Sequence, residues 1–146
     1  MSSRDRPVPG VGVAVVDAGR LLLVLRGRGS SAGMWAVPGG KVRYGERLVE
    51  AAAREAREET GLEVEVGEVV WVGESIGPGD PPAWHYVLTD FRARVVGGEL
   101  KAGDDAAAAE WVPLDEVGRY PVTPTMPGLM AALGGPPNRP VEEPGG

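Results

Sequence analysis

The stretch GKVRYGERLVEAAAREAREETGL, residues 40–62, decides the fold of this 146-residue chain. From Glu46 to Thr60 it contains no glycine or proline and is rich in alanine, the best helix former. Gly61 follows, at the position where a residue in the left-handed conformation commonly ends a helix. The pattern therefore predicts a helix over Glu46–Thr60 that ends at Gly61.

A helical wheel of this segment separates an apolar sector, which packs, from a charged sector, which faces solvent. The apolar sector contains Leu48, Val49, Ala51, Ala52, Ala53 and Ala56. The charged sector contains Glu46, Arg47, Glu50, Arg54 and Arg57. Three further acids, Glu55, Glu58 and Glu59, fall on the flank of the apolar sector. We therefore expect three carboxylates to converge beside a packed face.

These glutamates repel one another, because residues three and four apart on a helix are neighbours. Glu58 and Glu59 also stand in the last turn, where the negative end of the helix dipole disfavours acids. A bound cation offsets both penalties, and carboxylate oxygens suit Mg²⁺ or Mn²⁺. The alternative, from the residues alone, is a solvated acidic helix end offset by Arg54 and Arg57.

The wider spacing favours the metal site. Gly40, then Glu46 after five residues, then REAREETGL at 54–62 after seven more, match every fixed position of the Nudix box. The segments WAVPGG at 35–40 and WVPLDEV at 111–117 also resemble the flanks usual in that family. The chain thus resembles the Nudix hydrolases well beyond the box itself.

This resemblance implies an α+β fold, an α/β/α sandwich around a central mixed β-sheet. It places the domain at residues 10–133, after a flexible segment at 1–9 and before a disordered Gly/Pro-rich tail at 134–146. Short β-branched or Leu-rich runs between turn signals agree with that class. The expected strands are Val11–Val16, Leu21–Leu25, a short one from Trp35 that stops at Pro38, Val64–Val72, His85–Val96 and Ala107–Val112. A loop is expected at Gly73–Pro82, and further helices are expected at Leu114–Arg119 and Pro127–Leu133.

The resemblance also implies roles for the box residues. The implied metal ligands are Glu55, Glu58, Glu59 and the carbonyl of Gly40, and the implied metal is Mg²⁺ or Mn²⁺. Arg54 is implied to orient a glutamate through an ion pair. Glu46 is implied to support the loop or an outer-shell water.

The general base is left open. In many relatives a carboxylate from a loop outside the box takes this role, and here Asp104, Asp105 and Glu110 lie in the matching region. We take Asp105 as the first candidate. The alternative is that Asp104 and Asp105 only form a turn after Gly103.

The activity that the resemblance implies is hydrolysis of a nucleoside diphosphate linked to another moiety. Pro78 lies sixteen residues past Leu62, which is similar to a proline of the ADP-ribose pyrophosphatases in this superfamily. The first hypothesis is therefore cleavage of ADP-ribose or a nucleotide sugar to a nucleoside monophosphate and a phosphorylated product. A second is cleavage of an ordinary or oxidised nucleoside triphosphate with release of pyrophosphate. A third is a catalytically silent nucleotide sensor, which the three retained glutamates disfavour.

The substrate side is less defined. Arg26 and Arg28 follow the second expected strand and are either phosphate-binding residues or solvated loop charges. Trp35, Trp84 and Tyr86 are either stacking partners for a purine or parts of the core. His85, the only histidine, is more typical of a structural or exposed position than of a catalytic one.

Composition narrows the class of protein. The chain has 15 Lys and Arg against 21 Asp and Glu, a net charge of −6, which argues against nucleic acid polymers as partners. It has no cysteine, which excludes disulfides, thiolate catalysis and zinc–thiolate sites. The apolar runs are too short to span a bilayer, and no signal-peptide pattern is present. We therefore expect a soluble, cytoplasmic enzyme for small molecules, with monomer and homodimer left open.

Overall fold

The computed structural model of the chain describes residues 6–29, 31–103 and 106–134. A hairpin of two strands opens the fold, and its tight turn has Ala18 and Gly19 at positive φ. The elements in chain order are β1 (Val8–Asp17), β2 (Arg20–Arg26), β3 (Trp35–Ala36), β4 (Gly39–Lys41), α1 (Leu48–Thr60), β5 (Leu62–Ile76), β6 (His85–Gly98), β7 (Ala106–Pro113), the 3₁₀ helix η2 (Leu114–Arg119) and α2 (Met126–Gly134). None of the helices in this described part has the length and apolar content needed to cross a membrane.

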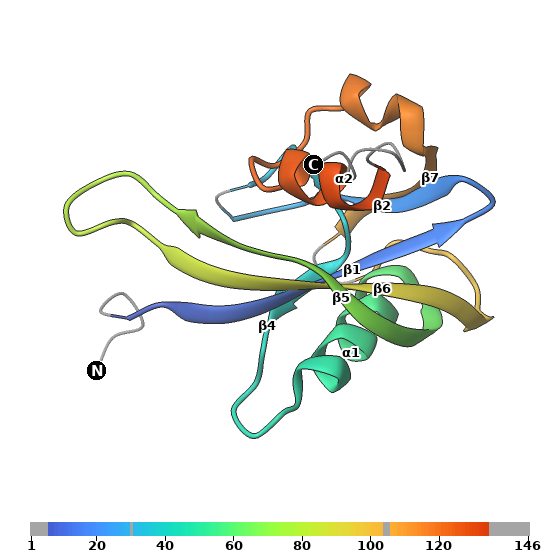
Figure 1. Cartoon of the computed structure of the whole chain (residues 1–146), viewed down its shortest axis with the longest axis horizontal. Helices are drawn as coiled ribbons and strands as arrows, with labels where there is room; N and C mark the ends of the chain where they lie inside the picture. The colour runs from blue at the N-terminus through green and yellow to red at the C-terminus, as the bar shows by residue number, and fades with distance from the viewer. Residues whose placement is uncertain (1–5, 30, 104–105, 135–146) are drawn as a thin grey trace, which may run out of the picture.

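The strands form one mixed sheet. Its order is β3-β2-β1-β6-β5, with β4 also paired to β1 and β7 to β2. β1 and β6 run parallel, from Val8 opposite Tyr86 to Val15 opposite Ala93, while the other pairs are antiparallel. β5 and β6 are long, curved strands that cross the whole molecule (Figure 1).

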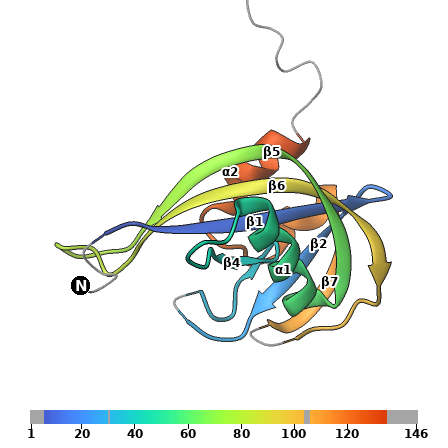
Figure 2. The ribbon, with the colours of Figure 1, turned by 90° about the horizontal axis from the view of Figure 1, so that it is seen from below.

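Helices cover both faces of the sheet (Figure 1). On one face, the alanines of α1 pack against alternate residues of β1, including Val11, Val13 and Val15. On the other, Met126 and Leu129 of α2 pack on a second core that also contains Ala14, Leu21, Leu23 and Val112. Figure 2 shows α1 lying against the sheet with β4 beside it. The predicted α/β/α sandwich on a mixed sheet is confirmed.

Most expected elements are present with shifted ends. The short strand expected from Trp35 is present as β3 and ends at Ala36, before Pro38, whereas β4, where a turn was expected, was not predicted. β5 continues through Ile76, so the loop expected from Gly73 begins later, and β1 begins at Val8, before the expected domain start. Gly134, expected in the tail, is the last residue of α2. The rest of that tail, 135–146, and residues 1–5 lie outside the described residues.

The predicted helix begins two residues late, at Leu48, and ends at Gly61 in the left-handed conformation with φ of 77°. The wheel, however, was wrong about two groups of side chains. Arg54, expected to face solvent, is only 8% exposed. Leu48 and Val49, expected in the packed sector, are 41% and 45% exposed. The buried face is therefore rotated, and it includes Glu59 as well as the alanines.

Candidate active site

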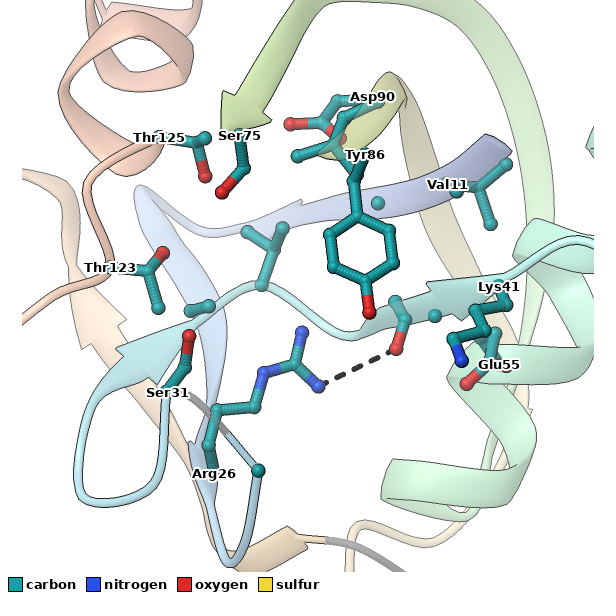
Figure 3. Close-up of a pocket in the computed structure, with 18 of the residues that line it drawn as sticks. Val11, Arg26, Ser31, Lys41, Glu55, Ser75, Tyr86, Asp90, Thr123 and Thr125 are labelled. Carbon is teal, nitrogen blue, oxygen red and sulfur yellow. Dashed lines mark hydrogen bonds between the residues drawn. The ribbon is translucent and has the colours of Figure 1, made fainter. Parts of the chain in front are cut away.

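A cavity of about 920 Å³ lies against the interior strands β1 and β6 of the sheet, and its volume is within the size range of small-molecule sites. Its walls come from the end of β2, from β4, α1, β5 and β6, and from the segment that enters α2. Figure 3 shows Glu55 and Lys41 at one end and Ser75, Asp90 and Thr125 at the opposite end. Segments distant in sequence therefore build two chemically different ends of one cavity.

The first end is organised by Arg54, in the middle of α1. Its Nε and Nη2 donate hydrogen bonds to the two carboxylate oxygens of Glu46, at 2.7 and 2.9 Å. Its Nη1 donates to Glu55 Oε2 at 2.8 Å and to Glu58 Oε1 at 3.2 Å. Nη2 also donates to the backbone carbonyl of Lys41 at 3.0 Å. One buried guanidinium thus holds three carboxylates and the loop before the helix.

This pairing changes the acidity of Glu46. The hydrogen bonds from the Arg54 guanidinium, helped by one from the Arg43 backbone N–H, lower the pKa of Glu46 to about 2 despite the cost of burial. The same contacts raise the pKa of Arg54 above its already high ordinary value. Both groups therefore stay charged throughout the physiological pH range.

Glu55 lies directly over the backbone of Gly40 in β4. A Cβ atom added to Gly40 would collide with the Glu55 carboxylate, so only glycine leaves this space open. Arg54 draws the carboxylates of Glu55 and Glu58 to a single nitrogen. Two hard oxygen donors beside a backbone with no side chain fit a divalent cation such as Mg²⁺.

Glu59 points to a different part of the same cavity. Its Oε1 accepts a hydrogen bond from the Gly39 N–H at 3.1 Å, and its Oε2 accepts one from Arg26 Nη1 at 3.3 Å (Figure 3, dashed line). Within the described residues, no three His, Cys, Asp or Glu side chains stand close enough to share a metal. The three glutamates line one cavity, but Glu59 is held apart from the other two by its own partners.

Comparison with known proteins identifies the family. The model of the NUDIX domain family matches residues 6–133. The chain belongs to this family. A crystal structure of a MutT NUDIX hydrolase from Burkholderia pseudomallei is similar with a TM-score of 0.80 and 31% identity, over 88% of this chain and 98% of that one.

Two curated relatives differ in the activities that their names state. The chain is 42% identical over 98 residues to an ADP-ribose pyrophosphatase of Methanocaldococcus jannaschii, covering 67% of this chain and 57% of that protein. It is 38% identical over 109 residues to an oxidized purine nucleoside triphosphate hydrolase of Danio rerio, covering 72% and 65%. The chain thus spans about six-tenths of the length of these Nudix relatives.

The other residues singled out in the sequence divide into two groups. Arg26, Arg28, Trp84 and Tyr86 line the cavity of this Nudix domain. Outside the lining are Trp35, Pro78, His85 and Glu110. Asp104 and Asp105 lie outside the described residues.

Each residue of the second group has another neighbour. Trp35 packs edge-on against Tyr120, with ring centroids 5.3 Å apart, as part of the core. His85 Nε2 lies 3.6 Å from Glu74 Oε1. Glu110 accepts a hydrogen bond from the Tyr120 hydroxyl at 3.1 Å. Pro78 accepts one at its carbonyl from the Ala83 N–H, within the loop between β5 and β6.

Sequence reasoning missed two polar residues of the site. Arg43 Nη2 lies 3.5 Å from Glu58 Oε2, so Glu58 contacts two arginines. Asp90, in β6, lines the opposite end of the cavity and is buried. An aspartate next to Phe91 in an expected strand was the available signal for the second of these, because carboxylates are depleted in strands.

Proposed function

We propose that this chain hydrolyses the diphosphate of a nucleoside diphosphate derivative, with ADP-ribose or a nucleotide sugar as the first candidate substrate. The observation that carries the proposal is the carboxylate cluster around Arg54, which stands at one end of a cavity large enough for a nucleotide. The likeness to a protein named ADP-ribose pyrophosphatase supports this choice of substrate.

The proposed ligands of a Mg²⁺ or Mn²⁺ ion are Glu55, Glu58, Glu59 and the Gly40 carbonyl. Glu59 would have to exchange its contacts with the Gly39 N–H and Arg26 for the ion. When bound there, a divalent ion would supply positive charge against the diphosphate and would lower the pKa of a bound water. Arg54 keeps the carboxylates in place through its hydrogen bonds, and Glu46 holds Arg54 by two of them. These two residues act as positioning residues, because their partners and not the substrate occupy their polar atoms.

Arg26 and Arg28 are proposed as phosphate-binding residues. Both line the cavity of a chain that carries a net charge of −6, so an anionic substrate needs local positive charge. Arg26 contacts Glu59 and the Gly39 carbonyl, the latter at 3.5 Å. Its guanidinium therefore stands between the second strand and the last turn of α1, beside the proposed metal ligands.

Asp105 is proposed as the general base. Of the nearest described residues, Gly103 donates its N–H to the carbonyl of Glu59 at 3.1 Å, and Ala106 donates its N–H to the carbonyl of Gly103 at 2.8 Å. We expect Asp105→Asn to lower kcat far more than Asp104→Asn, measured under saturating substrate. Equal, small effects of the two substitutions contradict this assignment and make Glu110 the next candidate.

A second candidate function is hydrolysis of an oxidised purine nucleoside triphosphate to the monophosphate and pyrophosphate. The 38% identity to a protein with that name supports it. The carboxylate end of the cavity serves both reactions, because both break a phosphoric anhydride. The difference between the two candidates therefore concerns the other end of the cavity.

The test is release of nucleoside monophosphate with and without Mg²⁺. The substrates are ADP-ribose, other nucleotide sugars, dinucleoside polyphosphates, and ordinary and oxidised nucleoside triphosphates. Fast Mg²⁺-dependent release of AMP from ADP-ribose supports the first candidate, and a preference for triphosphates supports the second. Binding of metal and nucleotides without any turnover overturns the hydrolase proposal in favour of a nucleotide sensor.

A further inference from the structure

Asp90 is a buried side chain whose carboxyl group has no partner among the described residues. It is 6% exposed, and within the described residues its carboxyl makes no hydrogen bond or ion pair. Burial alone raises the pKa of Asp90 to about 6. Among the described residues the one fully buried polar side-chain atom without a hydrogen bond is His85 Nε2, so the Asp90 oxygens, which also lack a bond, are open to the cavity. A ligand in the cavity can therefore supply their partner.

The backbone holds this carboxyl in a defined place. Asp90 is paired with Gly12 across the parallel β1–β6 ladder, and a Cβ added to Gly12 would collide with Asp90 Oδ1. The carboxyl therefore lies across β1, over the glycine and beside Val37. Glu55 and Gly40 are arranged in the same way, because there too a glycine leaves room for an acidic side chain from a neighbouring element.

The surroundings of Asp90 differ from those of the glutamates. Tyr86 and Leu88 precede it at alternate positions of β6, and both line the cavity. Trp84 forms another part of the wall, fixed by a hydrogen bond of 3.1 Å from its Nε1 to Ser75 Oγ. Flat and apolar side chains in the same cavity as this carboxyl, together with the hydroxyl residues Ser75 and Thr125 at its end, suit an aromatic ring that bears hydrogen-bond donors at its edge.

Charge excludes the phosphates from this end of the cavity. An ionised carboxylate repels an anion, and no cationic side chain is among the hydrogen-bond partners of Asp90. Arg26 and Glu55 stand at a distance from Asp90 in the cavity, as Figure 3 shows. A nucleotide whose diphosphate faces the glutamates would therefore present its nucleoside to Asp90.

We propose that Asp90 determines the base specificity of this domain by accepting a hydrogen bond from the exocyclic amino group of a purine base. This inference rests on the proposed function, because it assumes that the cavity takes a nucleotide. A ribose hydroxyl offers the same donor chemistry, and the apolar and aromatic walls favour the base over the sugar.

The experiment measures dissociation constants for nucleoside monophosphates, which contain no phosphoric anhydride to cleave, by calorimetry in the presence of Mg²⁺. Two pairs differ only in an amino group: AMP against purine riboside monophosphate, and GMP against IMP. We expect the native chain to prefer the amino-bearing member of at least one pair by about tenfold or more. Asp90→Asn should reduce that preference to about threefold or less.

Two further variants test whether the preference depends on the carboxyl of Asp90 in its native position. Asp17→Asn removes an exposed carboxylate from the end of β1 and should leave the preference intact. Gly12→Ala keeps the carboxyl of Asp90 but displaces it, so it should reduce the preference as Asp90→Asn does. A preference that survives both Asp90→Asn and Gly12→Ala overturns the proposal.

The remaining outcomes are also decisive. If the native chain shows no preference within either pair, Asp90 does not read the base. If Asp90→Asn instead removes a preference for AMP over dAMP, the carboxyl contacts the sugar, and the assignment to the base is overturned. An amino-dependent preference without any hydrolysis of the substrate panel contradicts the proposed function alone and leaves this inference standing.

Discussion

Arg54 and Asp90 are both buried, charged side chains that line the same cavity, yet their surroundings are opposite. Arg54 donates five hydrogen bonds, to three carboxylates and one carbonyl. Asp90 has no partner within the described residues, and burial raises its pKa to about 6. The charged groups at the Arg54 end therefore have hydrogen-bond partners without a ligand, whereas the carboxyl at the Asp90 end has none among the described residues.

This difference indicates which part of a nucleotide each end of the cavity recognises. A satisfied network holds its members in place, so the acids around Arg54 are positioned in advance of a metal or a diphosphate. An unsatisfied acid costs stability in the free protein and gains a partner only when a ligand binds. We therefore infer that the Arg54 end supplies the chemistry and the Asp90 end supplies selectivity.

The largest expected effect is on stability, from Arg54→Met. Removing this guanidinium leaves Glu46 and Glu55 as poorly exposed acids without their counter-charge, so we expect a loss of about 3 kcal/mol in the free energy of unfolding. Equilibrium denaturation in urea at pH 7 measures it. The matched control is Arg57→Met on the same helix, whose only ion pair within the described part is an exposed one to Glu63 at 3.7 Å. That control should cost less than about 0.5 kcal/mol. Equal losses for both variants would show that the Arg54 network does not differ from an ordinary surface pair.

The next effect is on turnover, from Glu58→Gln. This substitution keeps the size of the side chain and removes one charge from the proposed metal site, so kcat should fall about 100-fold or more. Glu63→Gln is the control, because Glu63 is an exposed glutamate that pairs with Arg57 and lies outside the cavity. The urea midpoint of both variants shows whether the fold is intact. An unchanged kcat for Glu58→Gln would remove Glu58 from the set of metal ligands.

The helix and the identity of its acids were predictable because both are local properties. Fifteen residues without glycine or proline, followed by Gly61, specify α1 with little help from the rest of the chain. The burial of Arg54 was not predictable from the wheel. It depends on the loop before the helix, which folds back so that Glu46 and the Lys41 carbonyl reach the guanidinium. A wheel contains no information about a neighbouring loop.

The Asp90 end of the cavity was harder to predict from the sequence, because its residues come together only through the pairing register of two strands. Gly12 and Asp90 are 78 positions apart and meet only through the parallel pairing of β1 with β6. Each residue alone has an ordinary interpretation: a glycine that interrupts an apolar run, and an acid in a long strand. Their pairing gives both a role, since the glycine provides the space that the acid fills.

The smallest expected effect is a pH dependence of the free energy of unfolding, with opposite signs for Glu46 and Asp90. The folded chain lowers the pKa of Glu46 from 4.5 to about 2, so its ion pair contributes stability above pH 4.5 that is lost as pH falls toward 2. The folded chain raises the pKa of Asp90 from 3.8 to about 6, so burial of its charge costs stability that appears as pH rises from 3.8 through 6. Relative to the native chain, Glu46→Gln should therefore lose stability on going from pH 3 to pH 7.

Asp90→Asn should change in the other direction. Between pH 3 and pH 7 its stability relative to the native chain should rise, because asparagine cannot ionise. The shift from 3.8 to about 6 corresponds to about 3 kcal/mol, which solvent in the cavity reduces to about 2 kcal/mol. Urea denaturation of both variants and the native chain across this pH range measures the two differences. If the difference in stability between Asp90→Asn and the native chain does not change with pH, the ionised carboxyl has a partner within the protein. In that case Asp90 does not need a ligand to supply one. A rising difference, together with lost base preference, identifies a carboxyl that lowers the stability of the free protein and contributes to ligand recognition.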